Sequence, residues 1–350
     1  MGLNKGISTL SDEQRSLALQ RLTALWAFNE SGLGGVLHAF QLPFTGLLVG
    51  GLAVVLICFI ASFSKSPYQQ ILRSLWIVLV VKALVSPHSP PMAYIAVSFQ
   101  AIIGFILFNI MGVNFFSILL LSVLAMLESA LQKLITLTLF FGQSFWKAFD
   151  SLVNYAASQF YVTANNVSQW IVGIYLLVYF LGGIIIAWVS YHLLHNFDIN
   201  FKPNITPLLP YPDTKIPESK PKKKNNFTRQ IGGLLVILIG IAAVLFFFAP
   251  NSKVAWINVL KSLSWTLCAL VLWYGIISPL FIKLAGRIAK QQKNKAVSDI
   301  ISFLPVLRQL SWAIWQQSKA HKGNRILFFV STLLHATLTY TNEDNPNTKL

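Results

Sequence analysis

The chain has 350 residues, of which 55% are hydrophobic and 11% are charged, and its mean hydropathy is +0.62. A soluble domain usually carries about 25% charged residues, so the composition excludes an ordinary soluble domain. Repeated apolar runs of roughly 18 or more residues predict transmembrane helices instead. The fold class that follows is an all-α, polytopic integral membrane protein.

The formal net charge of +16 is concentrated in two stretches. Seven Lys and Arg lie between His195 and Arg229, and nine lie between Lys283 and Arg325. Cytoplasmic loops of membrane proteins collect basic residues in this way. No nucleic-acid-binding module accompanies the charge, so we expect no nucleic-acid partner. Anionic lipid headgroups of the membrane are the expected partners of these stretches.

The N-terminal part begins with a helix predicted over Ser11 to Phe28, because Ser11 followed by Gln14 fits a capping box. This helix is either interfacial or a first span shielded by its neighbours. A glycine-rich junction follows from Ser31 to Gly51, with six glycines, and is predicted to have irregular backbone at the membrane edge. Spans or span-like segments come next at Phe44–Phe63 and Ile71–Val85, and an uncharged loop, SPHSPP, follows them.

The middle of the chain alternates apolar runs with short links. The linker Gly112–Asn114 separates the first two runs, and the stretch from Gln143 to Ser168 is predicted to be an interfacial helix because it is polar and aromatic. The apolar runs predicted to span are Met92–Met111, Phe115–Phe141 and Trp170–Leu194.

The sequence divides into four predicted regions, and the last three lie after residue 194. Six prolines and a lysine run make residues 195–229 a basic cytoplasmic linker between a six-helix bundle of residues 1–194 and a two-helix hairpin of residues 230–284. Residues 285–350 are predicted to form a basic amphipathic cytoplasmic tail. Within these regions we expect spans at Gln230–Ala249 and Leu263–Leu284, an amphipathic surface helix at Val297–Trp315, and a short span or surface helix at Arg325–Tyr340.

The charge distribution also predicts a topology of about eight spans. With a cytoplasmic N-terminus, six spans precede the basic linker, and the loop holding Lys65 and Arg73 falls inside. The SPHSPP loop then falls outside, and the last two spans return the tail to the cytoplasm. We therefore expect a multi-pass protein of the cell (inner) membrane.

Several polar residues lie inside or beside the apolar runs, where an ionisable side chain usually finds a partner in the protein interior. In the predicted topology they gather in the outer half of the six-helix unit, beneath the glycine-rich junction, which would act as a lid over a ligand cavity. The candidate ligand-binding residues are His38, Pro43, Thr45, Lys82, His88, Gln100, Glu128 and Lys133.

Structural roles are the alternative for the same residues. Glu128 and Lys133 would then form a pair, or either would pair with Lys82 or Glu30. The two lysines would reach the membrane interface, and the glycines would serve close helix packing.

Catalytic and metal-binding signatures are missing from the sequence: there is no HExxH, no nucleophile elbow and no P-loop. Cys58 and Cys268 both lie in apolar segments and predict neither a disulfide nor a metal site. The polar first fifteen residues predict no cleavable signal peptide. We expect no catalytic residues, no cofactor and no metal, and an ATP-driven system would need its ATPase on a separate chain.

The motif HAFQLPFTG, ahead of a glycine-rich second span, resembles the substrate-binding (S) component of energy-coupling-factor (ECF) transporters, over about residues 17–194. Leu42, Pro43, Phe44, Thr45 and Gly46 carry the resemblance. It implies a six-helix bundle that binds a small solute near the outer face under its first outer loop, with separate ATPase and transmembrane partner subunits. It would place Lys82, Gln100 and Glu128 near the substrate.

Three functions follow from these observations. The first is a prokaryotic membrane transport protein that binds a small solute in a cavity open to the outer face. The second is a non-catalytic membrane scaffold or assembly protein, whose basic tail engages lipid or partners. The third is a membrane-embedded transferase acting on a lipid-linked substrate, which the lack of catalytic carboxylates disfavours.

Overall fold

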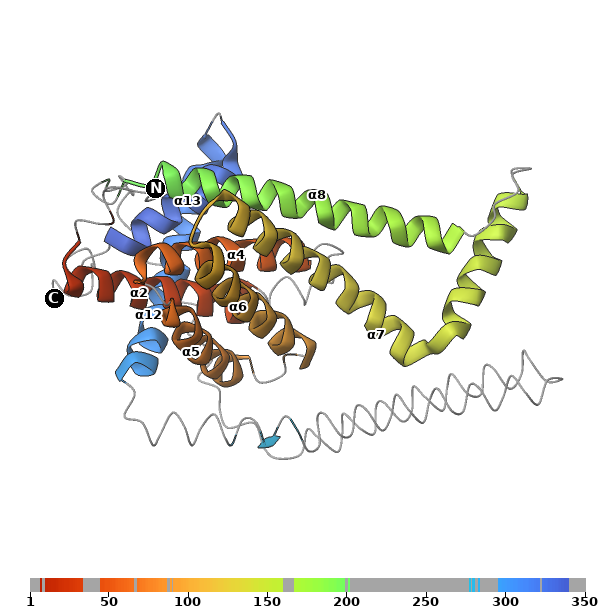
Figure 1. The fold of residues 1–350 in the computed structure, drawn as a ribbon, viewed down its shortest axis with the longest axis horizontal. Helices are drawn as coiled ribbons and strands as arrows, with labels where there is room; N and C mark the ends of the chain where they lie inside the picture. Colours follow the sequence, from red (N-terminus) through yellow and green to blue (C-terminus); the bar gives the residue numbers. More distant parts are fainter. Residues whose placement is uncertain are drawn as a thin grey trace.

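The computed structural model confirms the all-α prediction, since its described residues form helices and no strands (Figure 1). The description covers residues 7, 10–33, 45–65, 68–86, 89, 91–159, 167–198, 201, 277, 279–280, 283, 295–321 and 323–339. The predicted spans at 230–249 and 263–284 and the linker from 202 onward lie almost wholly outside these residues.

Four helices are long and apolar enough to cross a membrane. They are α4 (Thr45–Phe63), α6 (Pro91–Met111), the first part of α7 (Phe115–Ser158) and α8 (Val167–His195). All four were predicted as apolar spans. In the most apolar stretch of each helix, 72% of the residues of α4 are buried but only 22% of those of α8. Helix α4 is therefore central in the bundle and α8 is peripheral. The full count of eight spans stays a prediction, because α2 (Asp12–Phe28) and α5 (Gln69–Val85) have 17 residues each.

The predicted capping box of α2 is confirmed. Ser11 Oγ accepts the N–H of Gln14 at 3.2 Å, and the Gln14 side chain accepts the Ser11 N–H at 3.1 Å. Every residue from Leu22 to Ala27 is buried, because α2 packs against α4, α5, α12 (Lys295–Ala320) and α13 (Arg325–Thr339). The second half of α2 is therefore shielded by neighbouring helices.

The glycine-rich junction differs from its prediction at both described ends. Residues 31–33 belong to a π-helical turn, η1 (Asn29–Leu33), which continues α2, and residues 45–51 form the first turns of α4. Irregular backbone was predicted over the whole junction, but the overlapping span was predicted to begin at Phe44, and the structure agrees with the span over residues 45–51. Residues 34–44 lie outside the description.

The span predicted at Phe115–Phe141 and the interfacial helix predicted from Gln143 belong to one helix, because α7 runs without interruption from Phe115 to Ser158, over 44 residues. No proline lies in this stretch, and a single glycine at position 142 weakens a helix without ending it. Figure 1 shows α7 changing direction between its olive and yellow parts, and α8 running beside its first part. At about 1.5 Å per residue, α7 is far longer than a bilayer core is thick.

Small residues set the contacts between the apolar helices. A Cβ added at Gly183 of α8 would lie 2.8 Å from the Cα of Val123 of α7, and one added at Gly51 of α4 would lie 2.7 Å from Ile186 of α8. Helix backbones approach this closely only where one of them lacks a side chain. The Gly183 contact is of this kind, whereas Gly51 meets only the end of the Ile186 side chain, so the close-packing role considered for the junction glycines stays a prediction.

The C-terminal helices pack on the N-terminal ones. The amphipathic helix predicted at 297–315 forms the central part of α12, and its apolar stripe of Val297, Ile300, Leu307, Leu310 and Ile314 is buried in the common core. Figure 1 shows the blue α12 and α13 against the red α2. The Arg21 guanidinium donates to the Leu338 carbonyl at 2.6 Å, which joins α2 to the end of α13.

Candidate functional site

A buried ion pair lies where α2 ends. Lys82, in the last turn of α5, donates to Glu30 Oε2 at 2.7 Å, and each side chain is only 5% exposed. The ammonium also lies 5.8 Å from the centre of the Tyr94 ring, close enough for a cation–π contact. Lys82 was predicted as a ligand-binding residue, but in this structure its ammonium group is already paired with the Glu30 carboxylate.

The π-helical turn η1 is fixed to two helices beside this pair. The Asn29 side chain donates to the Val49 carbonyl of α4 at 2.9 Å, and Ser86 Oγ donates to the Ser31 carbonyl at 3.1 Å. These bonds hold Glu30 against α5. The sequence marked Glu30 and Lys82 as polar residues in apolar surroundings, but spacing alone did not pair them, because they are 52 residues apart.

Polar side chains of two other helices lie against the backbone of α4 at two of its glycines. Gly50 faces Gln100 of α6, whose Nε2 would lie 3.1 Å from an added Cβ, and it also faces Met126 of α7. One turn earlier, Gly46 faces Ser129 Oγ of α7. Gln100 and Ser129 are buried, so α4, α6 and α7 enclose a polar layer within the apolar bundle. Thr45, another predicted site residue, is buried at the start of α4.

Among the buried side-chain atoms without a hydrogen-bond partner in the described residues are three amide and carboxyl oxygens near this layer. They are Asn29 Oδ1, Gln100 Oε1 and Glu128 Oε2. All three are acceptors, one on a carboxyl group and two on amides. A buried acceptor left unsatisfied costs about 1–3 kcal/mol, so a donor group bound beside these oxygens would stabilise this part of the bundle.

Glu128 lies on the α6 side of α7. It shares a helix face with Gln132, four residues later, and the Gln132 amide donates to the Met92 carbonyl at the start of α6. The side chain of Lys133, by contrast, is exposed. The structure therefore brings Gln100 and Glu128 to facing helices and leaves Lys133 at the surface. The other three predicted site residues, His38, Pro43 and His88, lie outside the described residues.

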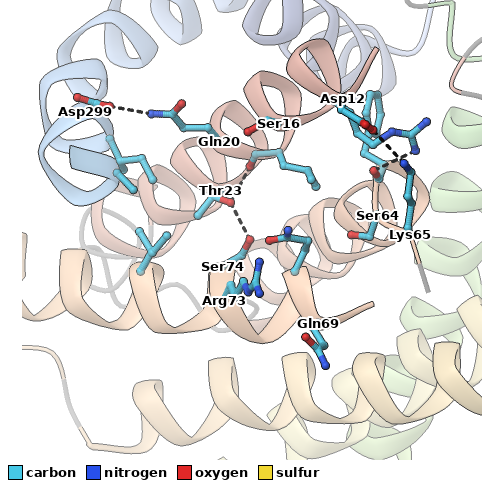
Figure 2. Close-up of a pocket in the computed structure, with 17 residues that line it drawn as sticks. Asp12, Ser16, Gln20, Thr23, Ser64, Lys65, Gln69, Arg73, Ser74 and Asp299 are labelled. Carbon is cyan, nitrogen blue, oxygen red and sulfur yellow. Dashed lines mark hydrogen bonds and ion pairs between the residues drawn. The ribbon is translucent and has the colours of Figure 1, made fainter. Parts of the chain in front are cut away.

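A pocket of about 590 Å³ lies elsewhere, along the first half of α2 (Figure 2). No predicted site residue lines it, so this hollow is not the outward cavity that was expected over Lys82, Gln100 and Glu128. Its walls come from α2, the end of α4, the start of α5 and the start of α12. Six residues of helix separate Thr23, the pocket residue nearest the end of α2, from Asn29, which corresponds to about 9 Å.

The charged rim of this pocket is mostly paired. Lys65 Nζ lies 2.9 Å from Asp12 Oδ1, and this hydrogen bond, together with the lysine charge, lowers the pKa of Asp12. The Arg15 guanidinium donates to the Phe63 carbonyl at 3.3 Å. Sequence reasoning missed the pocket: Lys65 was used only to orient a loop, and the wall from α12 comes from a distant segment.

The floor of the pocket holds two hydroxyl groups. Thr23 Oγ1 and Ser74 Oγ lie 2.7 Å apart and are hydrogen-bonded, and Figure 2 shows this pair between α2 and α5. At the rim, Gln20 of α2 donates to Asp299 of α12 at 3.2 Å. The pocket is therefore a polar hollow closed on one side by the C-terminal part of the chain.

Comparison with known proteins yields no match to a family model, to a curated protein or to a solved structure.

Proposed function

We propose that this chain is a membrane transport protein that binds a small solute within its helix bundle, in the manner of an ECF substrate-binding component. The observation that carries the proposal is the set of buried acceptor oxygens on Asn29, Gln100 and Glu128, which have no partner among the described residues. Intramembrane ionisable groups usually mark substrate or ion pathways. The ligand that matches this set bears N–H donors or a positive charge.

The proposed route to the site is from the outer face. The N-terminal part of α4 holds Gly46 and Gly50, and the charge distribution places this end of α4 outside. Gln100 is only 3% exposed, so entry of a solute requires the contact between α4 and α6 to open. Transporters alternate between such closed and open arrangements around a fixed site.

The Glu30–Lys82 pair has a supporting role in this proposal. A buried pair with both charges satisfied fixes the end of α2 against α5 and leaves Glu128 as the ionisable group that faces the ligand. Energy for transport would come from a separate ATPase and a transmembrane partner subunit. The proposed location is the cell (inner) membrane, with the N-terminus and the C-terminal tail in the cytoplasm.

Native mass spectrometry of the full chain, purified in mild detergent, tests the proposal. We expect a co-purified small molecule, seen as a mass shift, and its loss in Glu128→Gln and in Gln100→Leu. The matched controls are Glu13→Gln and Gln316→Leu, which make the same changes at exposed positions of α2 and α12 and should retain the adduct.

A mass spectrum of the bare chain in every preparation would contradict solute binding and would favour the scaffold alternative. An adduct that persists in both Glu128→Gln and Gln100→Leu would place binding elsewhere and would also contradict the proposed site. Unchanged thermal midpoints of the variants would show that loss of the adduct does not come from unfolding.

A further inference from the structure

The pocket along the first half of α2 is separate from the proposed solute site, and its charges are unevenly satisfied. Arg15, Lys65 and Arg73 line it together with two carboxylates, Asp12 and Asp299. Lys65 is paired with Asp12, and Asp299 accepts the Gln20 amide.

Arg73 differs from the other two cations of the pocket. Arg15 uses its terminal nitrogens on the Phe63 and Ile7 carbonyls, at 3.3 and 3.1 Å. Arg73 is exposed on α5 and makes no ion pair or hydrogen bond with the described part of the chain. Its guanidinium is therefore available at the pocket rim, and its planar donors match the oxygens of a phosphate group.

The lining of the pocket includes apolar as well as polar side chains. Leu19, Phe63, Ile77 and Ile300 contribute apolar surface around the hydrogen-bonded hydroxyl pair of the floor. A volume of about 590 Å³ lies within the range of small-molecule sites. A molecule with an anionic head and an apolar portion would satisfy both parts of such a pocket.

We propose that this pocket binds a phosphate group carried by an amphipathic molecule, with Arg73 as the main contact. Two sources share this chemistry: the headgroup of an anionic phospholipid, and a soluble phosphate compound. The pocket opens beside the end of α4 at Phe63 and Lys65, which the basic loops place at the cytoplasmic face, where anionic lipids attract Lys and Arg.

Lipid binding to the full-length chain, measured by native mass spectrometry, tests this inference. The probes are phosphatidic acid, phosphatidylcholine of the same acyl length, and inorganic phosphate as a competitor. We expect phosphatidic acid to bind better than phosphatidylcholine. Arg73→Gln should weaken its binding by about tenfold or more, because a charge-assisted contact is lost.

Two further variants make the test specific to the pocket. Ser16→Trp keeps Arg73 but fills the pocket from an exposed position of α2, and it should weaken binding to a similar extent. Lys319→Gln removes one exposed positive charge from the far end of α12 and should leave binding unchanged. The thermal midpoint of each variant shows that it is folded.

The results distinguish a lipid headgroup from a soluble phosphate compound as the ligand, and they test this pocket independently of the proposed solute site. Competition by inorganic phosphate would support a soluble phosphate compound as the ligand, and its absence, with selective binding of phosphatidic acid, would support the lipid headgroup. Equal binding of the two lipids, or an effect of Arg73→Gln no larger than that of Lys319→Gln, would overturn the inference. None of these results depends on Glu128, so the proposed solute site is tested separately.

Discussion

Glu30 and Lys82 show how two charges are accommodated where little water reaches them. Their 2.7 Å contact and 5% exposure mean that each charge is stabilised mainly by the other. Removing water from two ions is costly, so such a pair is weak evidence for added stability, but breaking it leaves an uncompensated buried charge. The pair therefore makes the junction of α2 and α5 sensitive to single substitutions.

We predict that Lys82→Met destabilises the protein by about 3–5 kcal/mol, because Glu30 is left buried without its partner. The double variant Glu30→Gln, Lys82→Met should recover most of the loss, since neither charge remains. Unfolding of the detergent-solubilised chain, followed by circular dichroism, measures both effects. A single variant as stable as the wild type would contradict the buried pair.

At the scale of the helices, close packing depends on glycines, which have no side chain. Gly183 of α8 faces the backbone of Val123, whereas Gly173 of the same helix has nothing within 4 Å of an added Cβ. The two glycines have the same cost in helix propensity but different surroundings. Substituting each of them in turn therefore distinguishes the effect of helix packing from the effect of helix propensity within α8.

We predict that Gly183→Ala lowers the thermal midpoint, because the added methyl group pushes α8 from α7 and overpacking costs roughly 1–3 kcal/mol. Gly173→Ala should be neutral or stabilising, since alanine favours a helix over glycine by about 1 kcal/mol. Thermal unfolding of the two variants in one detergent makes the comparison. Equal midpoints would show that the helices do not approach closely at Gly183.

At the scale of the whole molecule, segments far apart in sequence share one core. The stripe of α12 and the buried half of α13 lie with α2, α4 and α5 in a single apolar cluster. The bond from Arg21 to Leu338 spans 317 residues. The C-terminal helices described here therefore belong to the packed body of the protein.

The predicted topology is testable through the two ends of α5. Lys65, before it, is predicted to lie inside, and Ser89, after it, is predicted to lie outside. In a background with Cys58 and Cys268 replaced by alanine, Ser89→Cys should react with an impermeant maleimide in intact cells. Lys65→Cys should react only after permeabilisation, and labelling of both or the reverse pattern would contradict the topology.

The sequence predicted much of the local structure, because local structure depends on local composition. The runs 45–63, 92–111 and 170–194 are helices because each is apolar, long enough and free of internal proline. The capping box at Ser11 was also predictable, since both of its hydrogen bonds join residues three apart. The two helical segments predicted on either side of residue 142 form one helix, because a change in surface polarity does not end a helix that lacks a stop signal.

The candidate site was only partly predictable. Gln100 and Glu128 were identified because polar residues in apolar runs are costly, and the structure places them on facing helices. That Lys82 pairs with Glu30, and that Lys133 is exposed, depend on which helices are neighbours and how they are rotated. Gly46 and Gly50 gained a role only once Ser129 and Gln100 were found opposite them.

The sequence by itself determined that this is a helical protein with membrane-length apolar segments, and it located the four described helices that are long and apolar enough to cross a membrane. The tertiary structure decided which charges meet, which glycines face backbone or polar side chains, and where a pocket opens. The physical reason is the sequence separation of the residues involved. Helix formation and the apolar pattern of a segment depend on residues only a few positions apart. The pocket between Arg73 and Asp299 instead depends on packing between segments separated by more than 200 residues.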